Sequence, residues 1–220
     1  MSHFVSFLLL NAVIAFCSYT LHAQSLREVF QRFPLKRPEA SMTASPTNNV
    51  FYDADNGYLS IKTTTDAETE TTMQTVFARY TADDGTKYYA YQEITESRAN
   101  LCRRAFLKFY LLDADEWRDV TAQLLPSVRI SEFYGQKSTP NLIDVNGIIS
   151  YSPDDNKHGI GLGIDYVLSQ KGTMITATLV HRCDTAIKPE YKTLLNDCKF
   201  KTIELLWNKQ NGWFLMGKKR

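Results

Sequence analysis

Residues 160–180 read IGLGIDYVLSQKGTMITATLV, two alternating apolar segments on either side of a short polar turn. Alternation with a period of two is typical of a strand that buries one face. The turn is Gln170-Lys171-Gly172, and glycine readily adopts the positive φ that tight hairpins require. The stretch therefore predicts an antiparallel hairpin. Its predicted buried positions are Ile160, Leu162, Ile164, Tyr166, Leu168, Ile175, Ala177 and Leu179.

Other segments repeat this pattern. Apolar residues alternate over residues 105–111 and again over 203–207. Asp83-Asp84-Gly85 lies between the apolar segments 76–80 and 87–94, and Gln210-Asn211-Gly212 lies between 202–208 and 213–216. Three hairpins of consecutive strands predict an antiparallel meander.

Three helices are expected beside these strands. Ser25 and Glu28 form a capping box, and an apolar stripe of helical spacing follows from Leu26 to Phe33. A second capping box at 113–116 predicts a helix that Pro126 ends, and Pro189 predicts a turn or two of helix before Cys198. The stripe residues are Leu26, Val29, Phe30 and Phe33 in the first helix, Trp117, Val120, Thr121 and Leu124 in the second, and Tyr191, Leu194 and Leu195 in the third.

The predicted class is α+β and β-rich: an antiparallel meander sheet or sandwich of about eight to ten strands. An N-terminal helix packs on one side, and two short helices lie in crossovers. The predicted domains are a signal peptide at 1–23, a helix and linker at 24–50, and a single β-rich domain at 51–220.

The first 23 residues read as an export signal. Residues 4–16 are almost entirely apolar, residues 1–23 contain no Lys, Arg, Asp or Glu, and Leu21-His22-Ala23 precedes Gln24 as a cleavage pattern. The apolar run is shorter than the roughly 20 residues that span a bilayer, so no stable span is expected after cleavage. The sequence predicts a periplasmic or secreted protein beginning at Gln24. The alternative is a lipid anchor on Cys17.

The junction Ala23-Gln24 and the following Ser25-Leu26-Arg27-Glu28-Val29-Phe30 resemble the mature start of uncharacterised exported proteins from Bacteroidota-type bacteria. The resemblance covers about a dozen residues. It implies compartment and lineage, and it assigns no functional residue.

Three cysteines remain after removal of the signal. In an oxidising compartment Cys183 and Cys198 are the natural disulfide pair because they close a short loop. Pairing of Cys102 with either one stays open, since sequence alone does not fix connectivity.

The charge balance excludes a typical nucleic-acid-binding protein. The chain has 25 basic and 24 acidic residues, for a formal charge of +1, whereas nucleic-acid binders carry a concentrated basic field. Lys218-Lys219-Arg220 is interpreted as a solvated tail.

No catalytic or metal motif is present, and no cofactor is expected. Only His158 and His181 follow the signal, and neither has a partner at ligand spacing or a nucleophile motif nearby. Residues 53–57 have Gly57 where a calcium loop needs an oxygen ligand, so they predict a turn. A glycosidase-type carboxylate pair stays open because such pairs have no sequence spacing. Its candidates are Glu93, Glu96, Asp165 and Glu204.

Aromatic residues crowd the predicted strands, and the candidate ligand-facing ones are Tyr88, Tyr89, Tyr91, Trp207 and Trp213. Such residues form either a core or an aromatic-lined pocket. The leading hypothesis is an exported, non-catalytic binding or scaffold protein whose partner is a small molecule, a glycan or a protein. The alternatives are a glycan-directed hydrolase and a carrier of an apolar ligand.

Overall fold

The alternating segments form strands in the computed structural model, which describes residues 25–36, 48–66, 71–97, 102–134, 162–181, 196 and 198–220. These residues contain ten strands in two antiparallel sheets, which confirms the β-rich α+β class. The chain divides into two compact units, Met1–Lys36 and Arg37–Arg220, and both sheets belong to the second unit.

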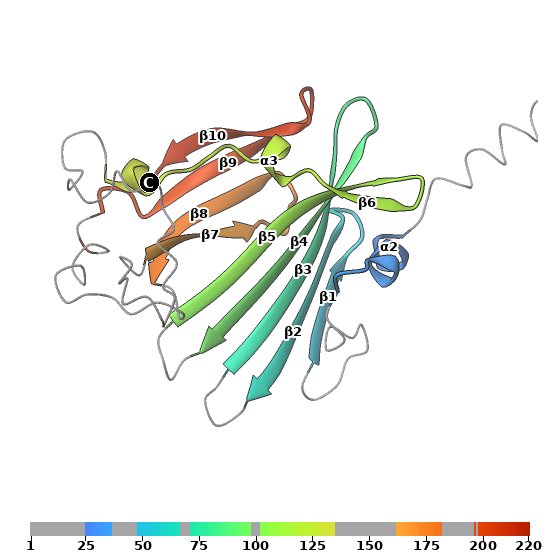
Figure 1. Cartoon of the computed structure of the whole chain (residues 1–220), viewed down its shortest axis with the longest axis horizontal. Coiled ribbons are helices and arrows are strands. Elements are labelled where there is room, and N and C mark those ends of the chain that lie inside the picture. The colour runs from blue at the N-terminus through green and yellow to red at the C-terminus, as the bar shows by residue number, and fades with distance from the viewer. Residues whose placement is uncertain are drawn as a thin grey trace, which may run out of the picture. The chain divides into compact units, whose positions relative to one another are not determined.

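The first sheet has six strands in sequence order, each paired with the next one along the chain. Figure 1 shows them as a continuous fan from blue to yellow-green. They are β1 (Asn48–Asp53), β2 (Tyr58–Asp66), β3 (Thr71–Thr81), β4 (Lys87–Ser97), β5 (Cys102–Asp113) and β6 (Glu116–Asp119).

The second sheet has the order β10-β9-β8-β7 and is again a meander. The hairpin predicted at 160–180 forms its β7–β8 pair, with Tyr166 opposite Ala177. β5 contacts β7 and β8, so the two sheets meet along that strand (Figure 1). The strands are β7 (Leu162–Leu168), β8 (Met174–His181), β9 (Thr202–Asn208) and β10 (Trp213–Lys219).

The two sheets share one apolar core. Its centre is the ring of Tyr80, which lies 5.7 Å from that of Phe109, 5.4 Å from that of Trp207 and 5.1 Å from that of Phe214. Ile175, Ala177 and Leu179 are buried in the same cluster, as their alternation predicts. Strands β3 and β5 of one sheet are thereby joined to β8, β9 and β10 of the other.

The capping box predicted at 113–116 is wrong, because these residues form a turn between β5 and β6. Ala114 and Asp115 have φ values of 44° and 73°, and positive φ at both central residues defines a tight hairpin turn of type I′. Pairing of Leu112 with Trp117 extends the sheet in place of the first helical turn. The helix is therefore reduced to α3 (Thr121–Leu124), and a 3₁₀ helix that the sequence did not predict, η1 (Ile130–Phe133), follows it.

The N-terminal helix is confirmed as α2 (Leu26–Arg32). Both halves of the capping box are present: the Glu28 amide donates to the Ser25 hydroxyl at 3.3 Å, and the Ser25 amide donates to the Glu28 carboxylate at 3.0 Å. Leu26, Val29 and Phe30 are buried. The signal at 1–23 and the helix at Pro189 lie outside the described residues and stay predictions.

Candidate functional site

A hollow of about 590 Å³ opens where β5, the β6–α3 junction and β7 meet. Its volume falls within the roughly 300–1,000 Å³ of small-molecule sites. The lining combines aliphatic side chains with a carboxylate, a hydroxyl and an amide. The lining residues are Leu107, Asp119, Val120, Thr121, Ala122, Gln123, Leu125 and Tyr166.

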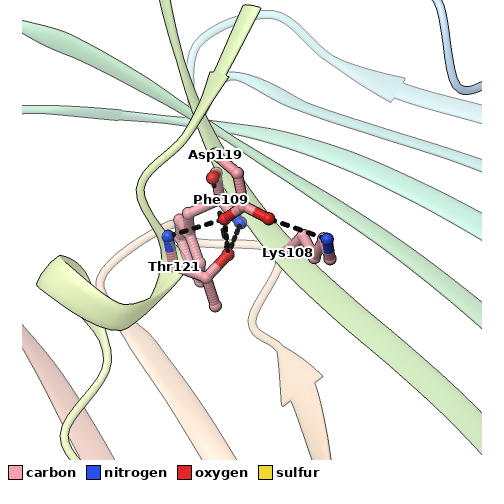
Figure 2. Close-up of polar contacts among 4 residues, drawn as sticks. All are labelled: Lys108, Phe109, Asp119 and Thr121. Carbon is pink, nitrogen blue, oxygen red and sulfur yellow. Dashed lines mark hydrogen bonds and ion pairs between the residues drawn. The ribbon is translucent and has the colours of Figure 1, made fainter.

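A polar cluster at the edge of the hollow is centred on Asp119 (Figure 2). One carboxylate oxygen forms an ion pair with Lys108 Nζ at 2.7 Å. The other accepts the Thr121 hydroxyl at 2.6 Å and the Thr121 amide at 3.0 Å. Both carboxylate oxygens are thus held by residues of the protein.

The same cluster fastens the start of α3 to β5. Thr121 Oγ1 accepts the Phe109 amide at 2.9 Å, and the Val120 amide donates to the Phe109 carbonyl at 2.9 Å. The β5–β6 pairing ends with Tyr110 opposite Asp119. These bonds therefore satisfy the backbone N–H and C=O of Phe109, the residue of β5 just beyond that pair. The Thr121 side chain here replaces a backbone partner from a neighbouring strand, and it fixes the β6–α3 junction, one wall of the hollow, against β5.

The protonation states of the cluster follow from these contacts. Partial burial opposes ionisation of Asp119, but hydrogen bonds from Lys108 and Thr121 outweigh it and lower the pKa of the carboxyl. The hydrogen bond and charge of Asp119 raise the pKa of Lys108 in turn. Burial, with the charge of Glu132, raises the pKa of Tyr166. At neutral pH the hollow therefore presents an ion pair and a neutral phenol.

Gln92 holds β7, whose Tyr166 forms another wall of the hollow. It lies on β4 and is 1% exposed, although it belongs to the first sheet rather than to that of β7. Its amide nitrogen donates to the Tyr166 carbonyl, and its amide oxygen accepts the Leu168 amide at 3.5 Å. One side chain thus satisfies two backbone groups of β7 and sets the position of Tyr166.

The five candidate aromatic residues lie in three places. Tyr88 and Trp207 belong to the core between the sheets, with ring centroids 5.8 Å apart. Tyr89 and Tyr91 are buried on the other face of the first sheet, as the register of β4 requires. Trp213 on β10 is 44% exposed. None of them lines the hollow described above.

The candidate carboxylates are likewise separate from the hollow. Glu93 accepts the Tyr91 hydroxyl at 2.5 Å, Glu204 forms an ion pair with Arg220 at 2.9 Å, and Asp165 is 4% exposed. Within the described part of the chain, no three His, Cys, Asp or Glu side chains gather as metal ligands. His158 and Cys183 lie outside that part, so the Cys183–Cys198 pairing stays a prediction.

The turn predicted at 53–57 is confirmed. The Asp53 carboxylate accepts the Asn56 backbone amide at 3.1 Å and its side-chain amide at 2.8 Å. A further bond comes from Gln170 at 3.3 Å. These bonds lower the pKa of Asp53 and occupy its oxygens in the turn.

Sequence reasoning missed Lys108, Asp119, Thr121 and Gln92, although two local signals point to the last three. An Asp-x-Thr stretch at the end of a strand commonly bonds its own backbone. Gln92 lies between Ala90 and Ile94 in the apolar part of one strand face, and a buried amide requires partners. Lys108 has no such signal because its contact depends on the pairing of β5 with β6.

Replacing Asp119 by asparagine tests the ion pair. Because the folded pKa of Asp119 lies below its ordinary value of 3.8, its stabilisation is present above that value and is lost as pH falls through the folded pKa. We expect Asp119→Asn to be less stable than the native protein at pH 7 and by a smaller amount at about pH 3, where the stabilisation has begun to be lost. Denaturant unfolding at both pH values measures the difference, with the exposed Asp55→Asn as control. If the difference in stability between the two proteins did not change with pH, the ion pair would not be the source of that difference.

Among the described residues no helix is both long enough and apolar enough to cross a bilayer. No protein-family model matches the chain, and no curated protein matches it significantly. Among solved structures, it is similar to a domain of an uncharacterized protein from Porphyromonas gingivalis W83, with a TM-score of 0.46 and 13% identity over 79% of this chain and 81% of that chain. A likeness at this level identifies neither a family nor an activity.

Proposed function

We propose that the chain is an exported, non-catalytic binding protein and that a small molecule occupies the hollow beside Asp119. The observation that carries this proposal is the composition of the hollow: partly buried hydrogen bonds fix the residues of its two walls, and polar groups lie beside aliphatic ones in its lining. Pockets with a few placed polar groups on apolar walls are typical of ligand sites.

The chemistry of the cluster favours binding over hydrolysis. Asp119 is the one carboxylate among the described residues that line the hollow, whereas a glycosidase needs two. Its pKa is lowered, and a general acid needs a raised one. Thr121 donates its hydroxyl proton to that carboxylate and accepts a backbone amide, so the hydroxyl is a structural group.

The packing of the core argues against the apolar-carrier alternative. Such a carrier needs space between the inward strand faces, but the rings of Tyr80, Phe109, Trp207 and Phe214 fill the region between β3, β5, β9 and β10 at centroid distances of 5.0 to 5.7 Å. We therefore propose a ligand with an apolar body, which contacts Leu107 and Leu125, and hydroxyl or amide groups, which reach Gln123 and the phenol of Tyr166. Glycans and other polyhydroxylated molecules have this character.

Amide NMR spectra recorded with pools of oligosaccharides and polar small molecules test the proposal. We expect a saturable binder to shift the resonances of residues 119–125 and Tyr166. Ala122→Trp places an indole ring in the hollow and should abolish those shifts. Ala54→Trp, an equal change at an exposed site in the β1–β2 turn, is the control and should leave them unchanged.

Two results would refute the binding site: no pool shifts these resonances, or a binder remains bound to Ala122→Trp. Shifts confined to Trp213 or to the edge of β10 would place the ligand elsewhere. Release of a product during the experiment would instead favour the hydrolase.

The export part of the proposal has its own test. Intact mass of the protein recovered outside the cytoplasm should begin at Gln24, and non-reducing peptide mapping should link Cys183 to Cys198. A mass that includes Met1 would contradict cleavage, and a lipid adduct on Cys17 would support the anchored alternative. A peptide link to Cys102 would replace the predicted disulfide.

A further inference from the structure

An apolar patch lies on the face of the second sheet that points away from the shared core. Met174, Leu206 and Leu215 are direct neighbours across β8, β9 and β10. The two leucines are 44% and 46% exposed, and Trp213, two residues along β10 on the same face, is 44% exposed. Contiguous exposed apolar surface of this kind marks an interaction site more often than an isolated exposed leucine does.

Basic residues flank this patch at both ends of the β9–β10 hairpin. Segment 198–220 contains six of the 25 basic residues and one of the 24 acidic residues, a formal charge of +5, so the rest of the chain carries −4. All six basic residues are exposed. Lys209 lies in the turn, and the other five lie at the opposite ends of the two strands. Two of them, Lys219 and Arg220, form ion pairs with Glu132 and Glu204. Lys218 and Lys219 also belong to β10, so the interpretation of residues 218–220 as a solvated tail is wrong.

We propose that this face docks on an anionic lipid surface. Apolar side chains that enter the boundary between headgroups and acyl chains, together with lysines that attract the lipid phosphates, are the two contributions that hold peripheral proteins on membranes. A tryptophan at such a boundary places its ring in the apolar layer and its N–H among the headgroups. The patch offers both contributions on one strand pair.

Two other occupants fit the patch less well. A second copy of the chain would bring the two basic 198–220 segments together, because a two-fold interface is self-complementary and like charges repel. An extended peptide would add to the edge of β10, but the register shift between Met216 and Lys219 and the lysines there are devices that discourage strand addition. A lipid surface would contact the face of the sheet and does not require an unpaired edge strand.

Co-sedimentation of the purified protein with vesicles tests the proposal. We expect binding to vesicles that contain equal amounts of phosphatidylcholine and phosphatidylglycerol, weak binding to phosphatidylcholine alone, and release at high salt. Lys209→Glu/Lys218→Glu and Trp213→Ser/Leu215→Ser should each weaken binding about tenfold. The matched controls are Lys62→Glu/Arg118→Glu, with the same change of charge, and Phe51→Ser/Phe106→Ser, with a comparable loss of apolar surface, at exposed positions of the first sheet.

Equal binding to both kinds of vesicle, or equal losses in patch and control variants, would overturn the proposal. So would a dimer, seen by sedimentation equilibrium, that Trp213→Ser/Leu215→Ser dissociates, because the patch would then be the interface between copies. Circular dichroism of each variant separates loss of binding from loss of folding.

Discussion

Phe109→Ala is expected to destabilise the protein by about 3–5 kcal/mol, a large part of the stability of a typical domain. The ring is fully buried, and its centroid lies 5.7 Å from that of Tyr80 and 5.4 Å from that of Phe214. Its removal leaves a cavity between the sheets that neither sheet can close alone. Thermal and denaturant unfolding should show the loss, with a decrease in Tm of roughly 6–20 °C for a chain of this size.

Phe106→Ala is the matched control, three residues earlier on the same strand. Phe106 lies on the opposite face and is 40% exposed, so its replacement should cost less than about 1 kcal/mol. Similar losses of stability for the two variants would mean that β5 does not bury the face that carries Phe109.

Gln92→Leu is expected to cost about 2–5 kcal/mol and to loosen β7 specifically. Leucine has a similar volume, but it leaves the Tyr166 carbonyl and the Leu168 amide without the bonds that Gln92 supplies. Each buried backbone group left unsatisfied costs about 1–3 kcal/mol. Hydrogen exchange should accelerate at Leu168 more than at Ile203 in the interior of β9.

Gln74→Leu provides the comparison. Gln74 donates to Ser60 Oγ at 2.8 Å within the first sheet and is half-buried. Its loss should cost about 1 kcal/mol and leave the exchange of Leu168 unchanged. If Gln92→Leu behaved in the same way, the bonds between Gln92 and β7 would contribute little to stability. The position of Tyr166 would then depend on the pairing of β7 with β8 alone.

The sequence predicted strand phase well for β8 but less well for β7, where Asp165 is 4% exposed and the predicted Ile164 and Tyr166 are only half-buried. Ile175, Ala177 and Leu179 alternate with polar residues, and in the structure those three face the core. A slip of one residue would place all three in solvent, so this pattern strongly determines the register. The hairpin turns at Gly85, Gly172 and Gly212 were predictable for a related reason: each glycine adopts positive φ.

The error at 113–116 has a physical cause. An acidic residue followed three positions later by glutamate satisfies a helix N-terminus, but the same four residues also fit a two-residue turn. Tertiary context decided between them, because Trp117 packs edge-on against Tyr89 and Tyr110 only if the chain turns back along β5. Local propensity contains no information about those ring contacts.

The candidate site was harder to predict than the fold. Lys108 and Asp119 are eleven residues apart, and Gln92 and Tyr166 are 74 apart. These pairs meet because of how the sheets are ordered and packed, and no spacing rule in the sequence encodes that arrangement. The aromatic residues were conspicuous in the sequence, yet four of the five candidates serve packing.

The meander order of both sheets affects how the chain folds during its synthesis. By the time Asp119 leaves the ribosome, every strand of the first sheet is present, but Trp207 and Phe214, which pack on Tyr80, have not yet been synthesised. A half-made chain therefore exposes an apolar sheet face that only the last strands can cover, and such intermediates aggregate unless they are held. Folding is coupled to completion of the C-terminal hairpin. If the chain is exported as we propose, this delay keeps it in an extended form that a translocation channel can accept.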